Sequence, residues 1–505
     1  MRRTVSARLT SYSEPSRQLN TWRAAVEVAA PAARQLASAV LMLGTLLAPG
    51  AHAAKPAAML ASTDTLHLSL DAAVARALKS GSDMQVARAS VGIAQGRVKE
   101  VLAGALPQIT GTMSYNRKFD SVFRDIATTD TSGLGDLFAN TSFGAVHGWT
   151  TDLTASQLLW SGGRVGAGIA AAKAVYKSVA NDRAQSEADV KLAVQQAYWN
   201  ALYSHEVVAI ARHGLSQARE HLRQVELYRK QGSRSEYDLL QAQVDAANSE
   251  PPLVAARSAA QLALLTLKRA LHLPLSQPLV LDSPLAFGDR QLPVPAEAPT
   301  DATVRPAVRS AEAAVAARRA ALRVEKSGRW PNLTASATLS HQAFPKDGTP
   351  ESEQFQRSMD ATLKLEWPFF QGFRTFGNVQ RASNELQQAM AQRDVARQTA
   401  EMELAQAQLA VEEALATLVA RRGTAQLAER THHLADVRWR NGLGTQLEVS
   451  DARLQMQNAQ VNEVLATKEY RLSLARLERA AGRPVATELK TYEELTFDPM
   501  PSEDR

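Results

Sequence analysis

A glycine-rich turn, Gly162 to Gly168, is the first stretch of this chain whose residue types could bind a ligand. Placed between a strand and a helix, it has a superficial likeness to the phosphate-binding loop of dinucleotide-binding proteins. Its glycines do not have the Gly-x-Gly-x-x-Gly spacing, and no second parallel strand follows within roughly 30 residues. We interpret it as a tight turn from a strand into a helix.

The histidines are the second group with chemical potential. His205, His213 and His221 are eight residues apart, which is about 12 Å along a helix and too far for one metal ion. His432 and His433 are adjacent and point to different helix faces. The sequence also shows no paired catalytic carboxylates and no nucleophile elbow. We therefore predict no enzyme activity, no metal and no cofactor.

Two carboxylates are the third group. Glu448 and Asp451 are three residues apart just after a turn, so they share one face of a helix. Their counterparts in the first half of the chain are Asp238 and Gln241. Taken alone, this spacing fits a solvated helix start, where acids are favoured by the helix dipole.

These groups lie within a unit that occurs twice. Three landmarks in the second half follow their counterparts by the same 210 residues: Arg164 and Arg374, Gly232 and Gly442, Pro274 and Pro484. Loops tolerate changes in length, whereas one added residue rotates the rest of a helix by about 100°. A constant offset therefore predicts a repeat built of packed helices.

Long helices account for most of each repeat. No proline interrupts residues 163–230 or 373–440, and helices of that length measure about 100 Å. The turns Gly232-Ser233-Arg234-Ser235 and Asn441-Gly442-Leu443-Gly444-Thr445 then send the chain back, which predicts helical hairpins over 163–271 and 372–481. Shorter helices are predicted over 83–105 and 303–328. Because proline disrupts a helix interior, Pro251-Pro252 predicts a kink or break near Asn248–Pro251.

Four segments alternate apolar and polar residues with period two, which predicts β-strands over 107–119, 150–160, 331–341 and 359–369. Segments of roughly 9–11 residues with one apolar face are typical of outer-membrane barrel strands, and aromatic residues flank them as in an interfacial girdle. Four strands do not close a barrel, since about eight is the minimum. The chain is therefore predicted to oligomerise, with two copies giving eight strands and three giving twelve.

The N-terminal 53 residues have the pattern of an export signal: arginines, a short apolar run and then Ala51-His52-Ala53. An amphipathic surface helix is the alternative. Six arginines and two glutamates in this segment supply four of the net six positive charges, so the remainder carries only two. We expect no nucleic-acid binding. The chain has no cysteine, which leaves no disulfides and no lipid-acceptor cysteine.

Several of these segments together resemble the TolC-type outer-membrane efflux and secretion channels. The resemblance covers roughly 65–490 and rests on the strand–Gly–Arg–helix junctions and on three groups of segments: Ser69 to Leu78; the strand openings Leu106-Pro107-Gln108-Ile109 and Trp330-Pro331-Asn332-Leu333; and Arg440 to Ala452. It implies a mainly α fold with a small β part, made of duplicated strand–long-helix hairpin units. In a trimer these units form a 12-strand outer-membrane β-barrel continuous with a periplasmic α-helical tunnel.

The domain organisation follows from this comparison. The predicted domains are a signal peptide (1–53), a first repeat (65–273), a Pro-rich connector or equatorial segment (274–302), a second repeat (303–484) and a C-terminal tail (485–505).

The resemblance also implies a function. We expect a passive outer-membrane conduit that carries small molecules from an inner-membrane pump and a periplasmic adaptor to the exterior. The homotrimer would contact outer-membrane lipid, its tips (Gly232, Ser233, Arg234, Ser235, Asn441, Gly442, Leu443, Gly444, Thr445) would dock the adaptor, and Glu448, Asp451, Asp238 and Gln241 would form the periplasmic aperture. A conduit for type I protein secretion and a periplasmic coiled-coil scaffold or adaptor are the alternatives.

Overall fold

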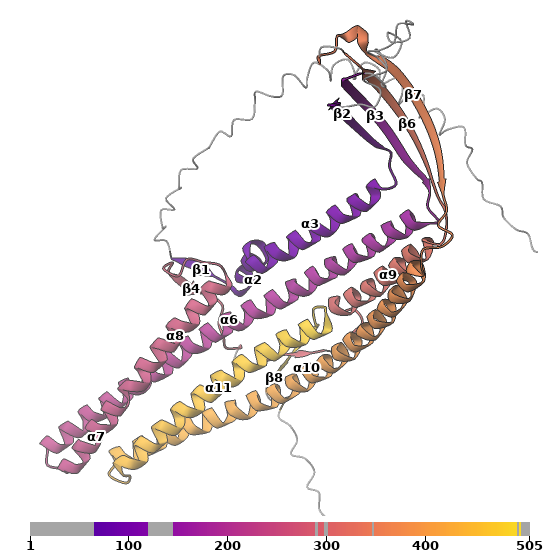
Figure 1. Cartoon of the computed structure of the whole chain (residues 1–505). Coiled ribbons are helices and arrows are strands. Elements are labelled where there is room, and N and C mark those ends of the chain that lie inside the picture. Colours follow the sequence, from indigo (N-terminus) through magenta and orange to yellow (C-terminus); the bar gives the residue numbers. More distant parts are fainter. Residues whose placement is uncertain are drawn as a thin grey trace, which may run out of the picture. The chain divides into compact units, whose positions relative to one another are not determined.

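The computed structural model describes residues 65–119, 145–287, 291–296, 301–345, 348–491 and 494–495 (Figure 1). The chain divides into units Met1–Ser62 and Thr63–Arg505, and all described residues lie in the second. The predicted signal peptide and most of the segment between the first two predicted strands lie outside these ranges.

Two helices of 67 residues each form the long arms of the repeats. They are α6 (Arg164–Lys230) and α10 (Arg374–Arg440), and both of their ends differ by the predicted 210 residues. Each begins after a left-handed residue, Gly163 with φ 82° and Phe373 with φ 63°. The turn read from the glycines of the first repeat is thus present in both, although Phe373 adopts the left-handed conformation without the freedom of glycine.

The returning helix differs between the repeats. In the second it is continuous, α11 (Gln446–Ala481). In the first it is divided into α7 (Glu236–Asn248) and α8 (Glu250–Ala270), separated by Ser249. Pro251 and Pro252 lie in the first turn of α8, where an N–H group has no partner within the helix. The predicted break is confirmed.

Three shorter helices pack against these arms. Contacts join α2 (Leu70–Ser80) and α3 (Ser82–Ala103) to α6, while α9 (Pro306–Ser327) contacts both α6 and α10. Within each repeat, α6 contacts α7 and α8, and α10 contacts α11. A further contact between α11 and α6 joins the two repeats. In the described ranges, no helix contains an apolar stretch long enough to cross a bilayer.

A four-stranded antiparallel sheet combines both repeats. Its strands are β2 (Gln108–Arg117), β3 (His147–Trp160), β6 (Asn332–Ala343) and β7 (Gln356–Glu366), in the order β2-β3-β6-β7. The last strand ends before Trp367-Pro368 and not at 369 as predicted, since proline has no N–H for the ladder. A 3₁₀ turn (Ser352–Gln354) precedes it.

The register of this sheet separates its side chains into two faces. Ile109, Ala155, Ala337 and Ala361 are directly paired across the four strands and share one face. One position along, Thr110, Thr154, Thr338 and Asp360 are paired on the opposite face. The outer strands β2 and β7 each have one edge without a partner strand among the described residues.

Two small sheets fix the connector. β1 (Leu66–Leu68) pairs in parallel with β4 (Leu279–Leu281), and β5 (Gln291–Pro295) pairs antiparallel with β8 (Thr487–Thr491). The second pairing joins the predicted connector to the predicted C-terminal tail. A buried tyrosine connects each small sheet to a long helix. Tyr198 of α6 donates to the Leu68 carbonyl oxygen of β1 at 2.9 Å, and Tyr470 of α11 donates to the Pro293 carbonyl oxygen of β5 at 2.5 Å.

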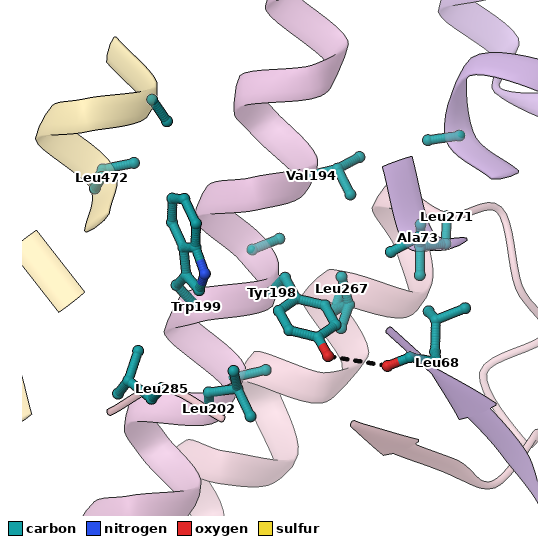
Figure 2. Close-up of a cluster of buried hydrophobic side chains, with 14 of the residues drawn as sticks. Leu68, Ala73, Val194, Tyr198, Trp199, Leu202, Leu267, Leu271, Leu285 and Leu472 are labelled. Atoms are coloured by element: carbon teal, nitrogen blue, oxygen red, sulfur yellow. Dashed lines mark hydrogen bonds between the residues drawn. The ribbon is translucent and has the colours of Figure 1, made fainter. Parts of the chain in front are cut away.

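The apolar cluster around Tyr198 is shown in Figure 2. It combines side chains of β1, α2, α6, α8 and α11, among them Leu68, Ala73, Leu267 and Leu472. The Tyr198 hydroxyl also accepts a hydrogen bond from the Ser283 N–H at 3.1 Å. One buried side chain thereby bonds a backbone group of β1 and one of the connector while its ring fills the core.

Candidate functional site at the helical tips

The two turns at the ends of α6 and α10 have the same backbone structure. Gly232 and Gly442 have φ 77° and 76°. In each turn the next N–H, that of Ser233 or Leu443, donates at 2.9 Å to the carbonyl oxygen five residues earlier. This is the hydrogen bond of a Schellman motif, which ends a helix through a left-handed residue. The tip residues named from the sequence, Gly232 to Ser235 and Asn441 to Thr445, all lie in these turns.

The returning helices begin with side-chain caps. Ser235 Oγ accepts from the Asp238 N–H at 3.2 Å, and the Asp238 carboxylate accepts from the Ser235 N–H at 3.0 Å, which is a capping box. In the second repeat Thr445 Oγ1 accepts from the Glu448 N–H at 3.2 Å. Asp238, assigned from the sequence to an aperture, therefore also caps the N-terminus of α7.

The acidic residues of the second repeat are in a different situation. Glu448 and Asp451 are both exposed and lie three residues apart in the first turns of α11. Asp238 and Gln241 at the corresponding places in α7 are half-buried. The second repeat thus presents two exposed carboxylates, whereas the first has one carboxylate and one amide at the matching places, both half-buried.

Trp439 joins the two tips, and sequence reasoning missed it. Its ring is 1% exposed and lies 4.3 Å from the His221 ring and 5.7 Å from the Tyr228 ring, centroid to centroid. The Arg234 guanidinium lies 5.0 Å from the same ring and donates to the Trp439 carbonyl oxygen at 3.1 Å. Packing around this ring completes an apolar cluster with Val225, Ala242 and Val449. A signal was available: Trp439 and Phe376 are the only aromatic residues in α10.

A second joint between the repeats lies at the break between α7 and α8. The Arg453 guanidinium of α11 is buried and donates to Asp245 Oδ1 at 2.5 Å, Ser249 Oγ at 3.2 Å and the Gly214 carbonyl oxygen at 3.1 Å. Ser450 donates to the other Asp245 oxygen at 2.7 Å. The joint therefore connects α11 to α6, to α7 and to the break itself.

Gly214 allows α11 to approach α6 at this joint. A Cβ atom at that position would lie 1.5 Å from the amide nitrogen of Gln457, which is an overlap. Any larger side chain would push the two helices apart or displace Gln457. The close approach explains how a guanidinium on α11 reaches a carbonyl oxygen of α6.

A polar cavity of about 350 Å³ lies between these two joints. It is lined by α6, α7, α10 and α11 residues that include His221, His432, Asp245, Asp436 and Arg453. Burial is the main cause that lowers the pKa of both histidines, and nearby Asp436 acts in the opposite direction. Within the described ranges, no group of three or more His, Asp or Glu side chains is arranged to hold a metal ion.

Comparison with known proteins identifies the fold. The sequence matches the family described as outer membrane efflux protein over residues 73–272 and 302–483. A curated relative, the pyoverdine export outer membrane protein OpmQ of Pseudomonas aeruginosa, is 30% identical over 280 residues. That alignment spans 54% of this chain and 56% of the relative, about half the length of each.

Solved structures share the architecture over most of their length. The outer membrane protein VceC of Vibrio cholerae superposes with a TM-score of 0.65 at 19% identity, covering 82% of this chain and 96% of VceC. The open-state MtrE outer membrane channel of Neisseria gonorrhoeae gives a TM-score of 0.67 at 19% identity, covering 83% and 89%. These matches confirm the predicted mainly helical fold with its small sheet. With two matched segments that correspond to the two repeats, this chain belongs to the outer membrane efflux protein family.

Proposed function

We propose that this protein is the outer-membrane channel of a tripartite export system, a passive conduit for small molecules. Its family and its similarity to the pyoverdine export protein OpmQ support this function. The observation that carries the proposal is the sheet. It has one apolar and one polar face, two edges without a partner strand among the described residues, and long helices attached to its strands.

The unpaired edges argue for a homotrimer. In lipid, each backbone group without a hydrogen-bond partner costs several kcal/mol, so β2 and β7 need partner strands. Pairing β7 of one copy with β2 of the next closes a ring. Three copies give twelve strands, wide enough for a lumen lined by the polar face that holds Thr154 and Asp360. The apolar face would then contact outer-membrane lipid.

The long helices α6 and α10 would form the part of the conduit that crosses the periplasm. Helices of 67 residues are about 100 Å long, so the tips lie far from the sheet along the same path. We assign the tips to docking of a periplasmic adaptor, which links the conduit to an inner-membrane pump. Glu448 and Asp451 would line the periplasmic aperture, with Asp238 and Gln241 behind them.

Cross-linking between the sheet edges tests the proposal. The chain has no cysteine, so Thr112→Cys in β2 and Thr362→Cys in β7 introduce the only thiols. A short bifunctional maleimide should convert this variant, in outer-membrane vesicles, into covalent dimers and trimers.

A matched control uses the two central strands. Thr154 and Thr338 lie directly opposite each other, with 3.1 Å between their Oγ1 atoms, so cysteines there should cross-link within one chain. Species larger than a monomer should appear only in the edge variant. A monomer in the edge variant, or fractionation with soluble periplasmic proteins, contradicts the proposed channel.

A further inference from the structure

The ring of His221 separates the tip cavity from the core of the joint. His221 lines the cavity on one side, and on the other its ring lies against buried Trp439. Its Nε2 atom lies 2.5 Å from Oε1 of Gln446, the first residue of α11. A single imidazole of α6 thus contacts both α10 and α11 at the place where the repeats meet.

Polar groups around this contact are incompletely satisfied. Gln446 is 3% exposed, yet its Nε2 atom has no hydrogen-bond partner, and the same holds for the Trp439 indole nitrogen and for Gln217 Oε1. Leaving a buried polar group unpaired costs about 1–3 kcal/mol. These unpaired groups lower the stability of the joint. The adjoining cavity gives water and protons access to the imidazole.

We propose that this contact makes the joint between the two hairpins acid-sensitive, so that protonation of His221 loosens α6 and α7 from α10 and α11. Burial would deprive the imidazolium of part of its hydration. The imidazolium would also share the cavity with the Arg453 guanidinium and with His432, which both repel it.

The charged groups that face His221 come from four helices, and they are Glu220 of α6, Asp245 of α7, His432, Asp436 and Arg440 of α10, and Arg453 of α11. The hydrogen bond to Gln446 favours the imidazolium, and so do Asp436 and Asp245. Each carboxylate already has a cation: Asp245 pairs with Arg453, Asp436 with Arg440, and Glu220 with Arg223. An added positive charge would compete for occupied partners.

The direction of the effect follows from proton linkage. Burial lowers the pKa of His221 in the folded tip below the ordinary value of 6.5. Above that ordinary value both states are neutral, and the contact contributes fully. As pH falls through about 6.5, the separated state binds the proton first, so the contact weakens until the folded pKa is passed.

Hydrogen–deuterium exchange of the full chain in detergent measures this loosening. Peptides spanning 214–248 and 435–460 should exchange faster at about pH 5.5 than at about pH 7.5, relative to peptides around Tyr198 in the same sample. The internal reference removes the intrinsic pH dependence of exchange. Each unit by which the pKa is lowered corresponds to about a tenfold change in the opening equilibrium.

Three variants separate the contributions. His221→Gln should reduce the acid response, because an amide does not take up the proton and only His432 of the cavity still does. His433→Gln, beside His432 but exposed and not part of the cavity lining, should retain it. Asp436→Asn should move the midpoint to lower pH, since it removes a charge that favours the imidazolium. If the joint of His221→Gln already opens at neutral pH, the midpoint shift of Asp436→Asn still tests the inference.

Two outcomes overturn the inference: an acid response that is undiminished in His221→Gln, or tip peptides that follow the reference at both pH values. Easier opening of the periplasmic entrance in acid is the consequence for transport, and that step rests on the proposed function. The exchange measurement reads contacts within one chain. Its failure would therefore leave the channel assignment intact, and failure of the edge cross-link would leave the acid-sensitive joint intact.

Discussion

Arg453 of α11 and Asp245 of α7 form a buried ion pair, 2.5 Å between Nη2 and Oδ1, across 208 residues of sequence. The Arg453 side chain is 3% exposed and that of Asp245 is 17% exposed. The pair connects the second repeat to the helix break of the first, so it is a strong polar interaction between the two hairpins near the tips.

Asp245→Ala should therefore destabilise the tips strongly. Removing one partner of a buried pair leaves an uncompensated charge and costs about 3–5 kcal/mol. Denaturant unfolding of the purified oligomer, followed by circular dichroism, measures the loss. Glu100→Ala is the matched control, because the Arg97–Glu100 pair is more than 60% exposed on both sides and should contribute less than about 1 kcal/mol. Equal effects would mean that the Arg453 pair is open to solvent.

Tyr198→Phe tests the attachment of the connector. The ring would still fill the cluster in Figure 2, but the Ser283 N–H would lose its partner, and the Leu68 carbonyl oxygen would keep only the Asp282 N–H at 3.1 Å. Buried groups left unpaired cost about 1–3 kcal/mol, and the loss should appear as lower thermal stability.

Tyr203→Phe is the comparison for this variant. Tyr203 lies one helical turn further along α6, is only half-buried, and its ring, which the change retains, faces the Lys468 ammonium at 4.9 Å. Its stability should stay close to that of the unmodified protein. A similar loss in both variants would show that the Tyr198 hydroxyl does not fasten the connector.

The repeat explains how far the sequence predicts this structure. The constant offset of 210 residues correctly predicted that α6 corresponds to α10 and Gly232 to Gly442. An insertion in a helix would rotate everything that follows, so the two repeats keep the same length. Pro251-Pro252 correctly placed the break, since a proline ring is incompatible with a helix interior.

Contacts between the repeats could not be predicted from the sequence. Arg453 resembles any other arginine on a long helix, and its pairing with Asp245 depends on the rotation and distance between α11 and α7. The cavity was missed for the same reason: His221 and His432 were judged only against neighbours on their own helices, yet they meet across α6 and α10. Hydrophobic periodicity predicts that a helix packs, but not which polar residue lies opposite another.

The two exposed carboxylates of α11 should set ion selectivity. Three copies of Glu448 and Asp451 around one axis would attract cations and repel anions. Replacing both with lysine should reduce cation preference in single-channel recordings and weaken block by multivalent cations. Asp238→Asn is the comparison and should change selectivity less, because it removes one half-buried charge and keeps a side-chain oxygen for the capping box. Unchanged selectivity in the double lysine variant would place these acids outside the aperture.

Leu443 should mark the docking surface. Its side chain is 72% exposed in the turn, so Leu443→Arg changes the surface without disturbing a core. Export should be lost while trimers still assemble. Gly442 is a poorer choice, since φ 76° would add backbone strain of about 1–2 kcal/mol to any effect on docking. Normal export by Leu443→Arg would show that the adaptor binds elsewhere.

Conductance of the purified protein in a planar lipid bilayer tests the central claim most directly. A trimeric conduit should insert and produce discrete, uniform current steps, and the Glu448 and Asp451 double lysine variant should change the selectivity of those steps. A protein that purifies from the outer membrane as a trimer yet gives no steps, with or without that variant, would contradict the proposed channel.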